Sequence, residues 1–168
     1  LEIAVAEVPR LRVDDRELRR AGPSYTVDTL ASLRGEFPDT PLCLILGMDS
    51  FLGLPGWHRW RELADYAHLV VLDRPGSVLP ESGELADWLA RRRIDTPERL
   101  GTNTTGAVYF HPVTQLDISA TRIRQLIAAG REPRFLMPEA VWRQIEAQGL
   151  YGWRDGNFHP HRSIGGHD

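Results

Sequence analysis

The stretch "PLCLILGMDS", residues 41–50, decides the fold that we predict for this chain. Its apolar run ends at Gly47, has the length of one strand, and lacks the polar alternation of a strand that faces water. We therefore expect a strand buried on both faces, of the kind that parallel sheets contain. Cys43, the only cysteine, lies inside the run, which excludes an intrachain disulfide and a multi-cysteine metal site. A reduced thiol in the core is the expected state.

Elements of alternating type surround this strand. The apolar runs 68–73 and 107–113 predict two further strands. A short extended segment is expected at 10–18, and Ser24 is expected to cap the first helix. Helices are predicted at 22–37, 56–67 and 84–93, and from Ser119 and about Pro138. Strands that alternate with helices in this way are typical of an α/β protein, a parallel sheet with helices on both faces.

Length and charge limit the classes of protein to consider. With 168 residues, of which 42% are hydrophobic, the chain is long enough for one compact domain with a sizeable core. We assign that domain to residues 1–153 and expect a disordered tail at 154–168, where apolar residues are few. The formal net charge of -3 gives no general attraction to nucleic acid or to an anionic membrane. No apolar run is long enough for a membrane span, so a cytoplasmic protein is expected. Whether it forms a homo-oligomer stays open.

The polar residues that follow the strands are the candidates for function, because ligands of open parallel sheets bind beyond the carboxyl ends of the strands. One of these stretches, "DISATRIR", begins a helix, and the unpaired N–H groups of a helix start attract phosphate. Ser119 and Thr121 add hydroxyl donors there. Arg122 and Arg124 lie about 200° apart on the helix, so only one of them can face a ligand. The alternative is an ordinary capped helix with both arginines in water.

Five motifs in this order resemble one enzyme family. The stretch "ISATRIR" is similar to the I-S-x-T-x-I-R motif of the nucleotidyltransferase superfamily. The stretches "PSYTVDTL", "GMDSF", "LPGWHRW" and "VVLDRPG" resemble those of bacterial nicotinate-nucleotide adenylyltransferase, and the resemblance extends to about residue 153. It implies a Rossmann-like fold and an enzyme that uses Mg2+ to join ATP and nicotinate mononucleotide, giving deamido-NAD and pyrophosphate. No metal-ligating side chain is assigned.

The resemblance also implies which residues bind ATP. Ser119, Thr121 and Arg124 would lie at its phosphates, which makes these three the catalytic candidates. Gly47 would allow the backbone to approach the ligand closely. Asp49 would accept hydrogen bonds from a ribose, and capping of the following turn is the alternative for this side chain.

A second set of residues is implied for nicotinate mononucleotide. Trp57 matches the aromatic residue that stacks on the pyridine ring, although without the resemblance it would be assigned to the core. Backbone N–H groups near Thr26, Val27 and His58 match those that hold the nicotinate carboxylate. Arg74 lies at a strand end and joins this set, with a surface ion pair as the alternative.

The sequence departs from the family at one point. Members open with a glycine-rich strand-loop-helix, G-G-T-F-D-P-x-H-x-G-H, whose histidines bind the triphosphate, and no such motif occurs in the printed residues. We therefore expect that an amino-terminal segment precedes Leu1 and that the strand-loop-helix is missing here. Two alternatives stay open: an adenylyltransferase for another phosphate acceptor, such as phosphopantetheine, and a catalytically silent nucleotide-binding module. The missing histidines are the reason to retain the silent module as an alternative.

Overall fold

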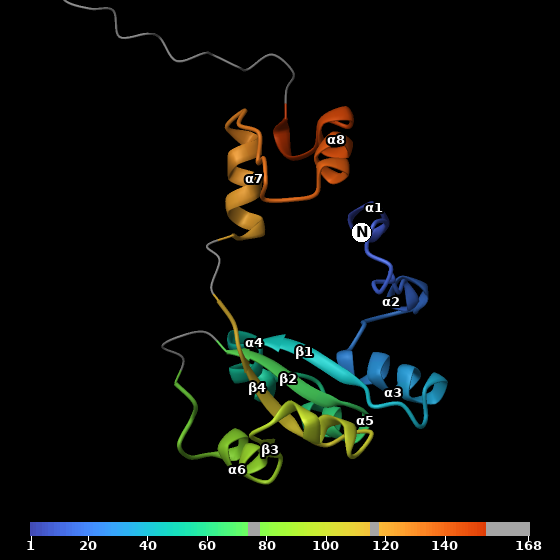
Figure 1. The fold of residues 1–168 in the computed structure, drawn as a ribbon, viewed down its shortest axis with the longest axis vertical. Coiled ribbons are helices and arrows are strands. Elements are labelled where there is room, and N and C mark those ends of the chain that lie inside the picture. Colours follow the sequence, from blue (N-terminus) through green and yellow to red (C-terminus); the bar gives the residue numbers. More distant parts are fainter. Residues whose placement is uncertain (74–77, 115–117, 154–168) are drawn as a thin grey trace, which may run out of the picture. The chain divides into compact units, whose positions relative to one another are not determined.

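The computed structural model of this chain describes residues 1–73, 78–114 and 118–153 (Figure 1). Arg74 and the tail predicted at 154–168 lie outside these ranges. The chain divides into two compact units, one formed by residues 15–115 and one by residues 1–14 together with the chain from residue 116 onward. The first unit holds the strands of the described residues and is called the sheet unit. The second is called the helical unit.

The described residues of the sheet unit form four parallel strands (Figure 1). The strands are β1 (Cys43–Gly47), β2 (His68–Asp73), β3 (Arg93–Ile94) and β4 (Val108–Pro112), in the order β1-β2-β4-β3. Leu44 of β1 pairs with Leu69 of β2, which pairs with Val108 of β4. The three predicted strands and their parallel direction are therefore confirmed. The fourth strand, β3, was not predicted, because its two residues are too few to form an apolar run in the sequence.

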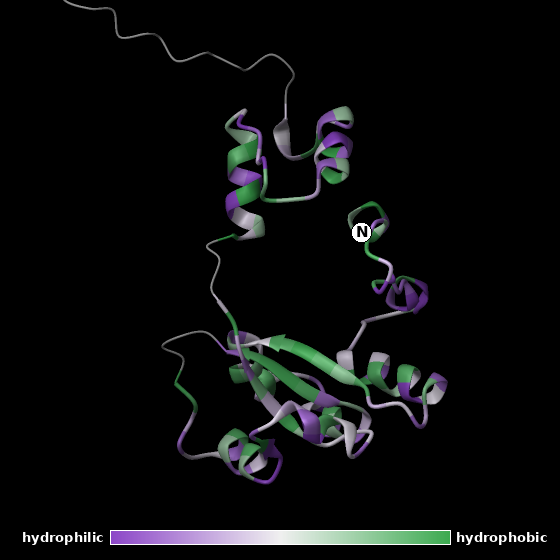
Figure 2. Ribbon diagram, in the orientation of Figure 1, coloured by the Kyte–Doolittle hydropathy of each residue, from purple (hydrophilic) through white to green (hydrophobic). Residues whose placement is uncertain are grey.

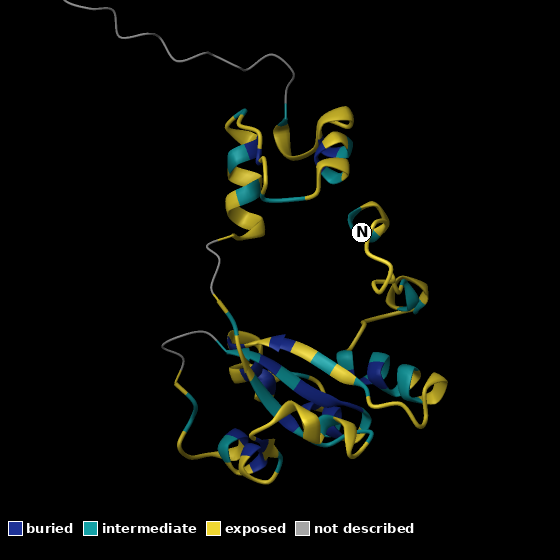
Figure 3. Ribbon diagram, in the orientation of Figure 1, coloured by how far each residue is buried: buried dark blue, intermediate teal, exposed yellow. Residues whose placement is uncertain are grey.

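One face of the sheet carries the core of this unit. Leu46 and Val71 lie in register on that face, beside Phe110 of β4. Four helices share the core: α3 (Thr26–Glu36), α4 (Met48–Leu52), α5 (Leu63–Tyr66) and α6 (Glu84–Ala90). Figure 3 shows the buried residues gathered where these helices meet the strands. Each large apolar side chain buried here contributes about 1.5–3 kcal/mol, so this cluster supplies most of the hydrophobic stabilisation of the unit.

The expectation of a buried thiol at Cys43 is wrong, because this residue is exposed. Along β1, Cys43 and Ile45 face away from the core while Leu44 and Leu46 face it, and Ile45 is 62% exposed. Among the described residues, β1 pairs with a strand on one side only, and the described helices of the sheet unit pack on its Leu44 and Leu46 side. A continuous apolar run does not reveal which faces of a strand are covered. Partial desolvation raises the pKa of the Cys43 thiol, which keeps it protonated.

The beginning of the sheet unit differs from the sequence prediction. Part of the segment expected to be extended forms a short helix, α2 (Arg16–Arg19). Ser24 is not the cap of α3, because Tyr25 takes the N-cap position. The Ser24 hydroxyl instead donates to the carbonyl oxygen of Glu17, at 3.4 Å. The prediction of the cap was wrong because a hydroxyl caps a helix only from the residue directly before its first turn.

The helix predicted at 56–67 is interrupted. It consists of a 3-10 turn at Leu54–Gly56, a second 3-10 turn at Trp60–Glu62, and α5. Residues 57–59 lie between the two turns, and Arg59, directly before the second turn, has a left-handed backbone conformation (φ 51°, ψ 37°). Trp57 and Trp60 therefore do not lie on one helix, in spite of their helical spacing.

Two polar side chains, His68 and Arg34, form hydrogen bonds near the amino-terminal ends of the strands. His68 is fully buried; its Nδ1 accepts from the Ala107 N–H at 3.0 Å and its Nε2 lies 2.9 Å from the Asn103 carbonyl oxygen. The ring therefore carries its proton on Nε2. Arg34 donates hydrogen bonds to the carbonyl oxygens of Phe37, Pro38, Thr40, Tyr66 and Thr104. These contacts hold the loop before β4 against α3 and α5.

The helical unit contains α1 (Glu2–Val5), α7 (Ala120–Ala128), α8 (Glu139–Ala147) and a 3-10 turn at Leu150–Gly152. Its small core consists of Ile127, Trp142 and Ile145. Figure 2 shows hydrophobic and hydrophilic residues on different sides of α7 and α8. The predicted helix starts at Ser119 and Pro138 are confirmed as N-caps. No helix among the described residues has the length and apolar character that crossing a membrane requires.

Candidate active site

A pocket of about 290 Å³ opens between two segments of the sheet unit. Its lining residues come from the start of α3 and from the turn before Arg59; they are Ser24, Tyr25, Thr26, Gly56, Trp57 and His58. This group is called the aromatic pocket. The Tyr25 and His58 rings stack with their centroids 4.2 Å apart and an interplanar angle of 29°, so side chains from the two segments already touch. Three residues predicted from the sequence, Thr26, Trp57 and His58, are thus brought together.

The α3 side of the aromatic pocket offers backbone donors. Tyr25 is the N-cap of this eleven-residue helix and makes no side-chain capping bond. Its carbonyl oxygen accepts from the N–H groups of Asp28 and Thr29. The N–H groups of Thr26 and Val27 come earlier in the first turn, where an α-helix has no acceptor for them. The Val27 side chain is 1% exposed and belongs to the core, so only its backbone is available to a ligand.

The Trp57 side chain serves both the core and the pocket. It is half-buried and packs against the core cluster, yet it also lines the aromatic pocket. Trp60 is 4% exposed and is a core residue. The resemblance assigned Trp57 to the ligand, whereas its spacing alone assigned it to the core. In the structure the side chain packs against the core cluster and also lines the pocket.

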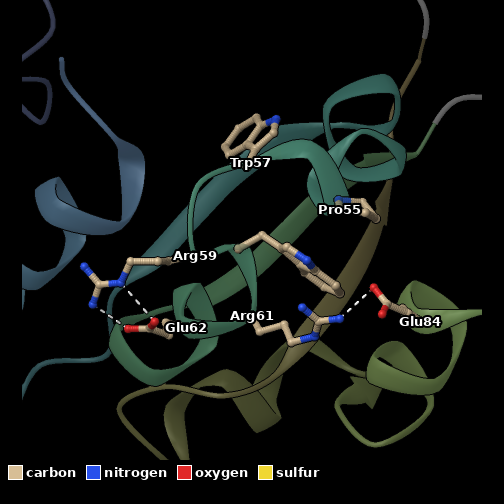
Figure 4. Close-up of a pocket in the computed structure, with 7 residues that line it drawn as sticks. Pro55, Trp57, Arg59, Arg61, Glu62 and Glu84 are labelled. Atoms are coloured by element: carbon tan, nitrogen blue, oxygen red, sulfur yellow. Dashed lines mark hydrogen bonds and ion pairs between the residues drawn. The ribbon is translucent and has the colours of Figure 1, made fainter.

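A second pocket, of about 440 Å³, shares Trp57 with the aromatic pocket (Figure 4). Two ion pairs line it. Arg59 bonds to Glu62, and Arg61 bonds to Glu84 at 2.6 Å while its guanidinium lies 4.7 Å from the centroid of the Trp60 ring. Charged groups that are already paired in this way leave little free hydrogen-bonding capacity for a ligand.

The carboxyl edge of the sheet carries Gly47 and Asp49, both exposed. Gly47 ends β1 and is the N-cap of α4, and a Cβ added there would meet no atom within 4 Å. The open space around Gly47 leaves its backbone accessible. Asp73, which the sequence did not single out, ends β2 at the same edge. Its Oδ1 is buried and has no hydrogen-bond partner among the described residues. A buried carboxylate oxygen normally has a partner, which makes Asp73 an additional candidate for contact with a ligand.

The start of α7, in the helical unit, gathers the other predicted residues. The Ser119 hydroxyl oxygen accepts from the Arg122 N–H at 3.1 Å, which confirms Ser119 as the N-cap. An Arg124 Nη donates to the Thr121 hydroxyl oxygen at 3.4 Å. All three predicted side chains are exposed. Since a hydroxyl that accepts one bond can still donate its own proton, capping by Ser119 leaves it able to bind an oxyanion.

Comparison with known proteins identifies the family. A cytidylyltransferase-like family model matches residues 1–126. A probable nicotinate-nucleotide adenylyltransferase of Halorhodospira halophila is 53% identical over 152 residues, which is 89% of this chain and 69% of that protein. Its counterpart in Aeromonas hydrophila is 50% identical over 149 residues, 89% of this chain and 70% of that protein. This chain belongs to the nicotinate-nucleotide adenylyltransferase family.

The fold agrees with membership of the nicotinate-nucleotide adenylyltransferase family. The structure of Plasmodium falciparum nicotinic acid mononucleotide adenylyltransferase complexed with APC superposes with a TM-score of 0.53 at 13% sequence identity. The match covers 80% of this chain and 61% of that chain, so this chain spans less than two thirds of the neighbour. The Rossmann-like class and the family expected from the five motifs are both confirmed.

The predicted site residues that the structure describes fall into three groups in this member of the nicotinate-nucleotide adenylyltransferase family, one of which is Gly47 and Asp49 at the carboxyl edge of the sheet. Four of them, Thr26, Val27, Trp57 and His58, lie at or beside the aromatic pocket. The start of α7 holds Ser119, Thr121 and Arg124. Tyr25 was missed, although it lies inside the quoted "PSYTVDTL" motif, because its contact with His58 joins segments that are far apart in the sequence. The ligand-binding roles of all these residues stay predictions.

Proposed function

We propose that this protein transfers the adenylyl group of ATP to nicotinate mononucleotide, giving deamido-NAD and pyrophosphate. The observation that carries the proposal is the aromatic pocket. The family motifs that contain Thr26 and Trp57 are distant in sequence, yet they line one space of a size that suits a pyridine ring. Trp57 offers that ring an aromatic face, and the first N–H groups of α3 offer its carboxylate two donors.

Selectivity for nicotinate over nicotinamide follows from these donors. N–H groups aimed at a carboxylate form charge-assisted hydrogen bonds, which are roughly twice as strong as bonds between neutral groups. The positive end of the α3 dipole adds to the attraction of an anion. A nicotinamide amide carries no charge, and its own NH2 group would face donors rather than acceptors. The same pocket therefore favours the acid over the amide.

The reaction requires positioning and electrostatic stabilisation, and no covalent enzyme intermediate. The 5'-phosphate oxygen of the mononucleotide attacks the α-phosphorus of ATP in line. A new P–O bond forms, the bond from the α-phosphorus to the bridging oxygen breaks, and pyrophosphate leaves with the electron pair. Ser119, Thr121, Arg124 and the first N–H groups of α7 stabilise the phosphate charge. Asp49 accepts hydrogen bonds from a ribose, with Gly47 beside it.

The proposal includes Mg2+ as the companion of ATP. The described residues contain no group of three or more His, Cys, Asp or Glu side chains that could hold a metal ion. In nucleotide sites Mg2+ is usually bound by substrate phosphates together with one or two carboxylates, so the phosphates of ATP would supply part of its ligands here. When bound, it supplies neutralisation of phosphate charge. The cytoplasmic location expected from the sequence stays a prediction.

The test is pyrophosphate release by the full-length protein, expressed from its native start codon, with ATP and Mg2+. Nicotinate mononucleotide, nicotinamide mononucleotide and phosphopantetheine are compared as acceptors at matched concentrations. A strong preference for nicotinate mononucleotide is expected. Equal or faster release with phosphopantetheine would assign the protein to another acceptor. Binding of ATP without release from any acceptor would favour a catalytically silent module.

A further inference from the structure

The two walls of the aromatic pocket belong to segments about thirty residues apart in the chain, and an ion pair connects them behind the pocket. Asp28 lies in the first turn of α3, two residues after Thr26. Arg59 follows His58 directly in the other wall. The Arg59 Nη1 and the Asp28 Oδ1 are 3.4 Å apart. This contact therefore joins the two walls in addition to the stacking of Tyr25 on His58.

Arg59 is held in a conformation that its residue type disfavours. Its left-handed backbone (φ 51°, ψ 37°) brings Cβ close to the following carbonyl oxygen, which costs free energy for every residue except glycine. Such a conformation persists only where neighbouring contacts impose it. Glu62 provides these contacts: its two carboxylate oxygens accept from the Arg59 Nε at 2.9 Å and from an Arg59 Nη (Figure 4). The hydrogen bond lowers the pKa of Glu62 and raises that of Arg59.

The ion pairs are too exposed to explain the arrangement by stability alone. The side chains of Asp28, Arg59 and Glu62 are 39%, 43% and 41% exposed. Ion pairs with this exposure stabilise proteins little, because water screens the charges and ordering the side chains costs entropy. We therefore assign these pairs a role in the geometry of the pocket walls, since their contribution to the stability of the fold is small.

We propose that Asp28, Arg59 and Glu62 form an ionic clasp that positions the two walls of the aromatic pocket for the nicotinate group. This inference rests on the proposed function. Glu62 fixes the Arg59 guanidinium, and the guanidinium holds Asp28 and with it the first turn of α3. The left-handed turn at Arg59 sets the direction of the Trp57–His58 segment. The backbone donors of the two walls, near Thr26 and near His58, are thereby held in place for the nicotinate carboxylate. The three residues are positioning residues and do not touch the substrate.

The chain offers a matched control for this clasp. Arg61, two residues after Arg59, also forms an ion pair and also lies beside a tryptophan. Its partner, Glu84, belongs to α6 and not to α3, so the Arg61 pair does not join the walls of the aromatic pocket (Figure 4). If the loss of a surface arginine were enough to change the kinetics, substitution of Arg59 and of Arg61 should change the KM values equally. Loss of the contact between the two pocket walls occurs only when Arg59 is substituted.

The experiment compares Asp28→Asn, Arg59→Gly, the double variant and Arg61→Ala in the full-length protein. Glycine adopts the left-handed conformation without strain, so Arg59→Gly removes the guanidinium and leaves the backbone turn permitted. We expect each clasp variant to raise the KM for nicotinate mononucleotide about five- to tenfold, with the KM for ATP changed by less than about twofold. The double variant should be no worse than the worse single variant, because both remove the same contact. Arg61→Ala should behave as wild type.

Several outcomes would overturn the clasp. The first is an Arg59→Gly variant whose KM values are those of the wild type, and the second is a clasp variant in which the KM values for nicotinate mononucleotide and ATP rise equally. The third is a double variant in which the effects of the two single substitutions add, and the fourth is an Arg61→Ala variant with the same KM values as Arg59→Gly. Thermal unfolding of each variant shows whether a KM change merely reflects a less stable fold. If the wild-type protein neither binds nor uses nicotinate mononucleotide, the proposed function fails and the clasp fails with it. If the wild type uses this substrate and the variants do not differ from it, only the clasp is wrong.

Discussion

At the scale of single residues, the proposed role of Trp57 is to stack on the pyridine ring of nicotinate mononucleotide. Trp57→Ala should raise the KM for nicotinate mononucleotide by about fivefold, because aromatic stacking contributes on the order of 1 kcal/mol and 1.4 kcal/mol corresponds to a factor of ten. The KM for ATP should change less. Trp57→Phe, which keeps an aromatic face and part of the core contact, should recover most of the loss. Steady-state kinetics with each substrate varied in turn tests this, and a larger effect on ATP would show that the stacking assignment is misplaced.

Arg34 acts on stability rather than on the ligand. Its guanidinium satisfies carbonyl oxygens in the loop after α3, at the end of α5 and in the loop before β4. Arg34→Ala should lower the free energy of unfolding by about 2–4 kcal/mol, since several partly buried acceptors lose a charged donor at once. Arg34→Lys should recover only part of this, because an ammonium cannot reproduce the planar fork of donors. Urea unfolding measures the stability of both variants. Equal stability of the alanine variant and the wild type would show that the Arg34 hydrogen bonds do not stabilise the fold.

At the scale of elements, the start of α7 has a structural role and a predicted ligand role that one substitution can separate. Aspartate caps a helix as well as serine does and also interacts favourably with the helix dipole. Ser119→Asp should therefore keep the stability of the protein within about 0.5 kcal/mol of wild type. The added charge should nevertheless repel the triphosphate and raise the KM for ATP by more than about tenfold.

Ser119→Ala is the control for that prediction. It removes the cap bond to the Arg122 N–H, which should cost about 1 kcal/mol, but it adds no charge. Its KM for ATP should therefore rise less than that of Ser119→Asp. If the two variants have the same KM for ATP, Ser119 is only a cap and the phosphate site lies elsewhere.

At the scale of the whole molecule, the two units differ in the size of their cores. The helical unit buries Ile127, Trp142 and Ile145, whereas the sheet unit buries residues from four helices and three strands. Local opening requires less free energy where fewer apolar contacts are lost. Amides of α7 and α8 should thus exchange through openings of lower free energy than amides of β2 and β4. Native-state hydrogen exchange followed by mass spectrometry tests this, and equal protection of both units would show that they unfold as one.

Much of the fold and part of the site could be predicted from the sequence. The strands β1, β2 and β4 and the starts of α7 and α8 were predicted, since apolar runs and capping residues are local signals. The five motifs indicated the family and three of the residues that line the aromatic pocket, Thr26, Trp57 and His58. The burial of Cys43 and the unbroken helix at 56–67 were predicted wrongly. In both cases the local sequence pattern was compatible with the prediction, but the observed conformation depends on how segments distant in the sequence pack.

The α/β class, the alternating order of strands and helices, and the motifs of the nicotinate-nucleotide adenylyltransferase family could all be predicted from the sequence alone. Each of them depends on residues that are neighbours in the chain. Only the tertiary structure decided that β1 pairs on one side only among the described residues and leaves Cys43 exposed, that Tyr25 stacks on His58, and that Asp28 pairs with Arg59. These facts depend on which distant segments meet. The spacing between segments is set by packing and by the backbone turn at Arg59, and neither leaves a periodic signal in the amino-acid sequence.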